Sequence, residues 1–399
     1  MKYIVVLGDG MSDEPIEALG GKTPLEYANT PVMDELASKG EMGMVQNVPA
    51  GMSPGSEVAN LSVMGYDPLT DFTGRSPLEA LSVGVAMESS DVIFRCNIVT
   101  VTEEEPYEEK TILDHSSGEI STEDADVLMD AVREAFNNDE FSFFTGTSYR
   151  HITVWKQGEV LELEPPHDHL GQVIGQFLPE NPKFREMMKK SFDILNNHPL
   201  NVKRAAEGKN KANSLWFWGA GTKPALQNFK EKTGLSGTMI SAVDLLKGIA
   251  VGAGMHSVDV PGATGSLDTN YEGKAQAALD ALLKENSEFV YIHLDGPDEM
   301  GHQGELEHKI QSIAYIDEKI VAAVKAGLDA AGEDYRILVL PDHPTPIRCR
   351  THTSDPVPFV LYDSTQSHDQ GCGFTEKEAR RSGVTVDHGY DLIQKLIGG

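Results

Sequence analysis

The sequence predicts an α/β protein with a mainly parallel sheet and helices on both faces of that sheet. Apolar runs of strand length alternate with longer segments whose apolar residues recur at helical spacing, which is typical of strands joined by crossover helices. The run at residues 3–7 is continuously apolar, as expected for a strand buried on both faces, and the other runs are similar to it. Acidic and imidazole side chains follow several of the runs, at the sheet edge where sites of this fold class form.

The expected elements follow in chain order. Strands are predicted at residues 3–7, 215–218, 289–294, 336–340 and 357–362. Helices are predicted at residues 31–39, 57–64, 241–253, 273–284 and 305–328, where apolar side chains recur on one face. The lysine-bearing segment 201–212 is expected to be a solvated loop.

A different pattern covers residues 83–174. Strand-like pieces at 91–101, 141–145 and 151–155 surround one helical segment at 122–136. We interpret this region as a smaller α+β domain, inserted into a core domain that comprises residues 1–82 and 175–399. The hinges are expected near residues 76–84 and 165–176.

The charge balance excludes several classes of partner. The chain of 399 residues has 62 acidic and 33 basic residues, for a formal net charge of −29. Such a surface repels nucleic acids and anionic lipids, so no nucleic-acid or membrane partner is expected. Apolar runs are too short for a membrane span or a secretory signal, and the three cysteines form no CxxC pair, so a cytoplasmic location is expected. The sequence indicates no oligomeric state.

Carboxylates and imidazoles occur in short segments near the ends of predicted strands. They are Asp9, Asp298, His302, Asp342, His343 and His352. Asp298 and His302 are four residues apart, so on a helical turn they share one face. Oxygen and imidazole donors without thiolate suit Mn²⁺, Mg²⁺ or Zn²⁺, and their number is sufficient for two adjacent divalent ions.

Ser56 follows Pro54-Gly55, immediately before the helix expected at residues 57–64. At a helix N-terminus, backbone N–H groups and the helix dipole stabilise an alkoxide or a phosphate ester. A bound metal ion favours the alkoxide further, which makes such a hydroxyl a nucleophile at neutral pH. The sequence therefore predicts a metal-dependent enzyme that carries a phosphoryl group on Ser56. A metal-binding protein without catalysis is the alternative, and it would not need this hydroxyl.

Several ordered segments resemble one known family over nearly the whole chain. They are Gly8-Asp9-Gly10 with Asp13, and residues 24–31, 54–62, 65–68, 74–80, 298–302, 342–343 and 352–353. This order resembles the cofactor-independent phosphoglycerate mutases of the alkaline-phosphatase-like superfamily, especially their archaeal-type branch. The resemblance implies an alkaline-phosphatase-like fold and an isomerase of glycolysis, with Mn²⁺ as the expected metal. It also implies that the inserted domain is a transferase-type domain that closes over the substrate.

The resemblance implies a role for each site residue. Asp298, His302 and His352 would hold one metal ion. Asp9, Ser56, Asp342 and His343 would hold the second ion, with Ser56 as the nucleophile that forms phosphoserine. The reaction would interconvert 3-phosphoglycerate and 2-phosphoglycerate without 2,3-bisphosphoglycerate.

The substrate implied by the resemblance is a small phosphorylated anion, whereas the protein is strongly acidic. Arginines must therefore gather at its binding site, and Arg75, Arg95 and Arg150 are the expected ones. Asp114 or His167 could transfer protons between the two substrate hydroxyls. His167 also lies in a His-Asp-His run, residues 167–169, which is either a metal cluster or, as we favour, a polar loop.

One position departs from the resemblance. The archaeal-type mutases commonly carry histidine where this chain has Asn60, which leaves open a homoserine kinase on the same scaffold. A metal-dependent phosphohydrolase is a further alternative. A kinase needs a nucleoside triphosphate as donor, whereas the mutase converts 3-phosphoglycerate with metal alone.

Overall fold

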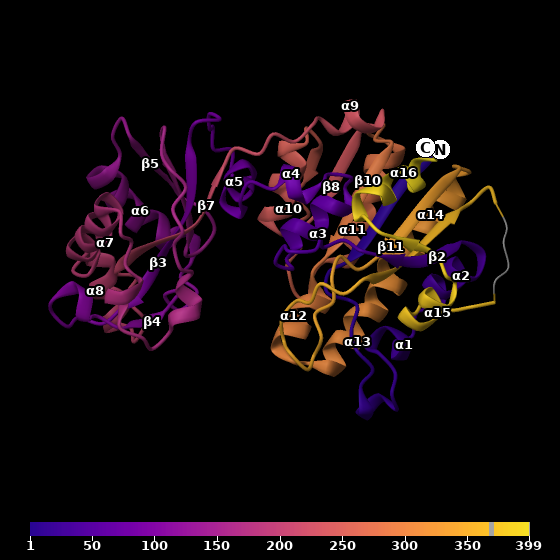
Figure 1. Cartoon of the computed structure of the whole chain (residues 1–399), viewed down its shortest axis with the longest axis horizontal. Helices are drawn as coiled ribbons and strands as arrows, with labels where there is room; N and C mark the ends of the chain where they lie inside the picture. Colours follow the sequence, from indigo (N-terminus) through magenta and orange to yellow (C-terminus); the bar gives the residue numbers. More distant parts are fainter. Residues whose placement is uncertain (367–370, 399) are drawn as a thin grey trace. The chain divides into compact units, whose positions relative to one another are not determined.

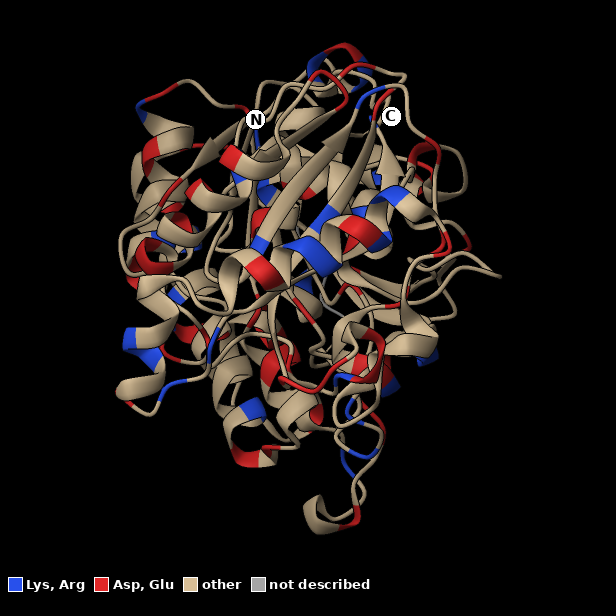
Figure 2. Ribbon diagram, turned by 90° about the vertical axis from the view of Figure 1, so that its left-hand side faces the viewer, with Lys and Arg blue, Asp and Glu red and all other residues tan. Residues whose placement is uncertain are grey.

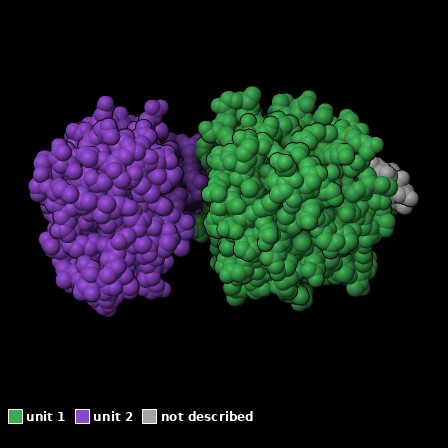
Figure 3. Space-filling model, turned by 90° about the horizontal axis from the view of Figure 1, so that it is seen from below, with its two compact units in different colours: residues 1–72, 225–399 green, residues 73–224 purple. Residues whose placement is uncertain are grey.

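The computed structural model describes residues 1–366 and 371–398. The chain forms two compact units, which are coloured separately in Figure 3. Unit 1 comprises Met1–Phe72 and Ala225–Gly399, and unit 2 comprises Thr73–Pro224. Each unit has a hydrophobic core of its own, so each is described separately.

Unit 1 is built on an eight-stranded sheet in the order β13-β2-β12-β11-β1-β10-β8-β9 (Figure 1). Its strands are β1 (Lys2–Gly8), β2 (Glu41–Val45), β8 (Gly237–Ile240), β9 (His256–Val258), β10 (Phe289–Leu294), β11 (Tyr335–Leu340), β12 (Val357–Asp363) and β13 (Thr385–Val386). The central strand β1 pairs in parallel with both β10 and β11, and β12 runs antiparallel to both of its neighbours. The predicted α/β class with a mainly parallel sheet is confirmed.

Helices cover this sheet because its strands are apolar on both faces. Successive residues of β1, Ile4, Val5, Val6 and Leu7, are all fully buried. The helices of unit 1 are α1 (Pro24–Tyr27), α2 (Pro31–Lys39), α3 (Ser56–Val63), α4 (Pro68–Asp71), α9 (Phe229–Thr233), α10 (Asp244–Gly252), α11 (Tyr271–Leu283), α12 (Gly296–Gln303), α13 (Leu306–Tyr315), α14 (Ala322–Ala331), α15 (Glu376–Arg381) and α16 (Leu392–Ile397). The helix predicted at 305–328 is divided by a π-helical turn, Ile316–Val321, between α13 and α14.

Unit 2 contains a five-stranded antiparallel sheet in which β3 is central. Its strands are β3 (Val92–Val101), β4 (Ile112–Asp114), β5 (Phe141–Phe144), β6 (Arg150–Trp155) and β7 (Ser214–Thr222). Its helices are α5 (Arg75–Ser82), α6 (Thr122–Phe136), α7 (Pro182–Leu195) and α8 (Pro199–Ala206). The strands and the helix predicted for the inserted domain all lie in this unit.

Unit 2 is larger than the insertion predicted at residues 83–174. The strand predicted at 215–218 was assigned to the large parallel sheet, but β7 instead pairs antiparallel with β3. The loop predicted at 201–212 was wrong in its first half, because α8 extends to Ala206 and buries Asn201 and Arg204. Both differences have one cause: the partner that covers a segment is distant in sequence and leaves no local signal.

Acidic residues are spread over helices and loops, and basic residues are fewer (Figure 2). Within the described part of the chain, no helix combines the length and the apolar character needed to cross a bilayer.

Candidate metal centre and active site

The candidate metal centre lies in unit 1, at the carboxyl ends of three neighbouring strands. Because β10, β1 and β11 are parallel neighbours, the segments that follow them emerge at the same sheet edge. Asp9 follows β1, Asp298 lies on α12 after β10, and Asp342 follows β11. The turn after Asp9 needs glycine: Gly10 has φ +60°, and a Cβ there would lie 2.7 Å from Asp298 Cα.

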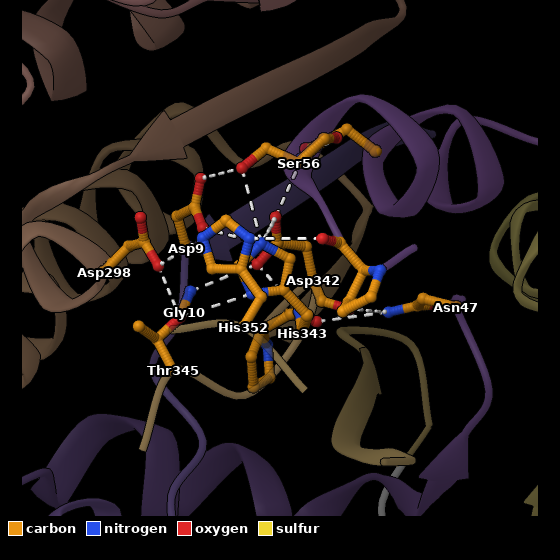
Figure 4. Close-up of polar contacts among 12 residues, drawn as sticks. Asp9, Gly10, Asn47, Ser56, Asp298, Asp342, His343, Thr345 and His352 are labelled. Atoms are coloured by element: carbon orange, nitrogen blue, oxygen red, sulfur yellow. Dashed lines mark hydrogen bonds and ion pairs between the residues drawn. The ribbon is translucent and has the colours of Figure 1, made fainter. Parts of the chain in front are cut away.

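Among the described residues, three groups of donor atoms form at this edge, and two of them consist of predicted ligands alone (Figure 4). The first comprises Asp9, Asp342 and His343, and the second comprises Asp298, His343 and His352; within each group the donor atoms lie within 4.8 Å of one another. His302 joins the second group, since its Nε2 lies 3.2 Å from Asp298 Oδ2. All six predicted side-chain carboxylates and imidazoles are therefore brought together, and His343 is common to both groups.

The electrostatics of the centre favour a bound cation. Burial raises the pKa of Asp9 well above its ordinary value, and the charges of Asp342 and Asp298 raise it further. Asp9 Oδ1 is one of the buried oxygens that has no hydrogen-bond partner within the described structure. In the second group, His302 Nε2 and His352 Nε2 face each other at 2.9 Å. Convergent imidazole nitrogens and unpartnered carboxylate oxygens are what divalent-metal sites require.

Ser56 contacts the first group directly. It is the first residue of α3, whose N-cap is the extended Gly55. Ser56 Oγ donates a hydrogen bond to Asp9 Oδ2 at 3.1 Å and lies 3.4 Å from His343 Nε2. The hydroxyl therefore lies both beside the metal-ligand groups and at a helix N-terminus, as the sequence predicted.

His293 orients Asp9, a role that the sequence analysis did not assign. Its Nε2 lies 2.9 Å from Asp9 Oδ2, and its Nδ1 lies 3.2 Å from Ser241 Oγ. The ring is fully buried on β10, and burial lowers its pKa to about 3, so it is neutral. Asp295 also approaches Asp9 and His293 as a third group of donor atoms.

Asn60, the position that departs from the resemblance, orients Asp342. Its Nδ2 donates to Asp342 Oδ2 at 2.9 Å and to the Ser56 carbonyl at 2.9 Å. Its Oδ1 accepts a 2.6 Å hydrogen bond from Tyr291 Oη. The Asn60 side chain is fully buried. Its hydrogen bonds therefore orient the candidate ligand Asp342 and the first turn of α3.

Lys309 forms hydrogen bonds with two loops, the one after β1 and the one after β11, which contain the ligands of the first donor group. This fully buried lysine on α13 donates to Asp13 Oδ2 at 2.8 Å and to the Thr345 carbonyl at 2.7 Å. Thr345 Oγ1 in turn donates to Asp298 Oδ1. Sequence analysis missed Lys309 because a lysine in a helix is ordinarily solvated.

Replacing Lys309 with methionine should destabilise the protein strongly, because Asp13 would remain buried without its charged partner. We expect a loss of about 3–5 kcal/mol in the free energy of unfolding, measured by urea denaturation. The control is Lys39→Met, since the ion pair of Lys39 with Glu35 is exposed to solvent and should contribute little to stability. Equal effects of the two substitutions would contradict a structural role for Lys309.

The predicted arginines gather in unit 2, around Glu79 of α5. Glu79 Oε1 accepts hydrogen bonds from Arg75 Nε at 2.8 Å and from Arg95 Nη1 at 3.1 Å. Burial opposes ionisation of Glu79, but the charges of Arg95, Arg75 and Arg150 lower its pKa. We call Arg75, Glu79, Arg95 and Arg150 the arginine cluster.

Aromatic side chains and His167 border the arginine cluster. The Arg95 guanidinium lies 5.0 Å from the Trp218 ring, and Arg150 lies 5.3 Å from the Tyr149 ring. The His167 ring lies 5.4 Å from Trp218. Burial lowers the pKa of His167, and the charges of Arg95 and Arg75 contribute to that lowering. A neutral imidazole beside the cluster is suited to accept a proton.

The surroundings of Asp114 differ from those of His167. Asp114 Oδ1 accepts hydrogen bonds from the Ser116 N–H and Oγ, and Oδ2 accepts from the Gly118 N–H and from Asn210 Nδ2. Burial opposes ionisation, but these hydrogen bonds lower the pKa of Asp114. They favour a structural role in the turn after β4. Residues 167–169 are not among the donor groups with metal-site spacing found in residues 1–366 and 371–398.

The sheet and its bordering donor groups define the class of protein. The fold is an α/β sheet with helices on both faces, and it places a hydroxyl beside a carboxylate–imidazole centre. Two solved structures have the same architecture over the whole chain. The PH0037 protein from Pyrococcus horikoshii has a TM-score of 0.81 at 29% identity, and covers 100% of this chain and 97% of its own. The cofactor-independent phosphoglycerate mutase from Thermoplasma acidophilum has a TM-score of 0.67 at 26% identity, with 100% and 99% covered.

Sequence comparison then shows the family. A family model described as 2,3-bisphosphoglycerate-independent phosphoglycerate mutase matches residues 37–201. The chain is 49% identical to the probable enzyme of that name from Geobacter sulfurreducens, with all of both chains covered. It is 46% identical to the one from Methanosarcina barkeri, with 100% of this chain and 99% of the relative covered. The chain belongs to the 2,3-bisphosphoglycerate-independent phosphoglycerate mutase family, whose members are metal-dependent isomerases.

Proposed function

We propose that this protein interconverts 3-phosphoglycerate and 2-phosphoglycerate without 2,3-bisphosphoglycerate, through a phosphoserine at Ser56. The observation that carries the proposal is the position of Ser56 Oγ, 3.1 Å from Asp9 Oδ2 and 3.4 Å from His343 Nε2, at the N-terminus of α3. A group that only held a metal would not need a hydroxyl there.

The donor groups fit two divalent ions. Asp298, His302 and His352 would hold one, and Asp9, Ser56, Asp342 and His343 would hold the other. Oxygen and imidazole donors suit Mn²⁺, Mg²⁺ or Zn²⁺, and Mn²⁺ is the first choice because the family resemblance implies it. When bound, these ions would neutralise phosphate charge and favour the serine alkoxide.

The chain's own residues carry out the transfer. Ser56 Oγ loses its proton and attacks the phosphorus of 3-phosphoglycerate, the bond from phosphorus to the C3 oxygen breaks, and that oxygen takes a proton. The O2 hydroxyl of glycerate then loses a proton and attacks the phosphoserine, the bond from phosphorus to Ser56 Oγ breaks, and Oγ takes a proton. N–H groups at the start of α3 stabilise the phosphoserine. We assign substrate binding to Arg75, Arg95 and Arg150, and proton transfer to His167 in preference to Asp114.

The difference at Asn60 does not favour a kinase. An exchange of substrate would be expected to change a side chain that reaches the substrate, but the Asn60 amide is fully buried and bonded to Asp342, Ser56 and Tyr291. Asn60 therefore affects the orientation of the Asp342 carboxylate and not the choice of substrate.

The purified protein with Mn²⁺ should convert 3-phosphoglycerate to 2-phosphoglycerate in an enolase-coupled assay that contains no 2,3-bisphosphoglycerate. Neither a nucleoside triphosphate nor homoserine should be needed, because the phosphoryl group comes from the substrate itself. Release of inorganic phosphate instead of phosphoenolpyruvate would indicate a phosphohydrolase. Absence of conversion, together with phosphorylation of homoserine by ATP, would indicate the kinase.

A further inference from the structure

A buried carboxylate at the centre of an anion-binding site requires a reason. The Glu79 side chain is 12% exposed, and that of Arg95 is 8% exposed. A glutamate there repels the anion that the arginines are suited to bind. A purely stabilising role is also a weak explanation, since buried ion pairs lose in desolvation much of what they gain in attraction.

Glu79 neutralises only part of the positive charge of the arginine cluster and accepts only some of its hydrogen bonds. Arg95 Nε is a buried donor without a hydrogen-bond partner in the described structure. Among the charged groups that act on Arg95, Glu79 favours its charged form, whereas Arg75 and Arg150 oppose it. The positive charges therefore exceed the negative one, and an unused donor remains, so an anion would complete the arrangement.

The two hydrogen bonds to Glu79 converge on a single oxygen. Arg75 comes from the same helix, four residues earlier, and Arg95 comes from β3. Because both guanidinium groups donate to Oε1, Glu79 sets the angle between them. A guanidinium fork binds phosphate or carboxylate well only in a defined orientation.

We propose that Glu79 is a positioning residue that aims Arg75 and Arg95 at the substrate and limits the affinity of the arginine cluster for anions. This proposal rests on the proposed mutase function. Glycerate must turn before its O2 hydroxyl takes back the phosphoryl group, so a cluster that held the carboxylate or phosphate too tightly would slow the reaction.

The test removes the charge of Glu79 with Glu79→Gln in the whole chain loaded with Mn²⁺, and measures anion affinity and kcat separately. The amide is nearly isosteric and can still accept a hydrogen bond, but it carries no charge. Inorganic sulfate is the probe, titrated by calorimetry. We expect Glu79→Gln to bind sulfate about tenfold more tightly, because one nearby negative charge is removed. We expect kcat to fall about 10²-fold, because a neutral amide oxygen holds the two guanidinium groups less firmly at their angle than a carboxylate oxygen does.

Two further variants control the interpretation. Glu140→Gln, which removes a carboxylate paired with Lys183 elsewhere in unit 2, should change neither sulfate affinity nor kcat. In an Arg95→Met background, Glu79→Gln should alter sulfate affinity less than about twofold, because the two sites are coupled. Sulfate binding that is unchanged or weaker in Glu79→Gln overturns the proposal, and so does tighter binding with unchanged kcat. The sulfate titration remains informative if the wild-type protein lacks mutase activity, so failure of the proposed function and failure of this inference are distinguishable.

Discussion

Ser56→Ala should lower the kcat of the mutase reaction by roughly 10⁴–10⁶-fold, the range found when a covalent nucleophile is removed. Without Oγ no atom of the chain can accept the phosphoryl group at the start of α3. The fold should be preserved, because alanine keeps the backbone at the first position of the helix and removes one partly buried hydroxyl. The enolase-coupled assay measures the loss.

A second measurement on the same variant tests the intermediate directly. Wild-type protein quenched during turnover should carry one phosphoryl group on the peptide that contains Ser56, detected by mass spectrometry, and Ser56→Ala should carry none. Ser53→Ala is the matched control, because Ser53 is an exposed serine in the same loop and should have no effect. Activity of Ser56→Ala above a tenth of wild type would refute a phosphoserine mechanism.

His343→Ala should damage the metal centre more than the loss of any other imidazole. Its Nε2 lies 3.5 Å from Asp9 Oδ1 and 3.4 Å from Asp342 Oδ2, and it belongs to both donor groups. Because a change in a residue that only supports a ligand costs 10–100-fold in metal affinity, we expect at least about 10²-fold here, with kcat lowered about 10³-fold or more. Removing the metal with a chelator should abolish activity in the wild type.

Calorimetric titration with Mn²⁺ separates the contributions of the histidines. His302 belongs to the second group only, and its side chain is 36% exposed. His302→Ala should therefore weaken the binding of one Mn²⁺ ion and leave the binding of the other unchanged. His308→Ala, at an exposed histidine of α13 that pairs with Glu305, should leave both ions unaffected. If His343→Ala binds Mn²⁺ as His308→Ala does, the two-ion assignment is wrong.

Much of the candidate metal centre was predictable because its residues stand next to features that can be read in the local sequence, namely the end of a strand or the start of a helix. The run at residues 3–7 indicated a strand buried on both faces, and Asp9 follows it directly. Ser56 was marked by the Pro54-Gly55 pair before a helix. Once parallel strands were predicted, their carboxyl ends had to meet at one edge, so Asp298 and Asp342 were expected near Asp9.

The residues that hold the ligands in place could not be predicted in the same way. Lys309 and Glu79 are polar side chains within ordinary helices, and nothing nearby in sequence shows that other elements cover them. His293 lies in a run predicted to be buried, but that run does not show which side chain His293 contacts. The sheet partner of β7 was missed for a related reason, since an apolar run shows that a strand is covered but not by which neighbour.

Local periodicity was therefore enough to predict the α/β class, and the residue types at strand ends were enough to choose the residues proposed as metal ligands and nucleophile. Only the tertiary structure decided which unit receives β7 and α8, and which charged groups orient the site. The physical reason is that a buried charge is tolerated only where a partner neutralises it. For Lys309 with Asp13, and for Arg95 with Glu79, that partner comes from another element of the fold.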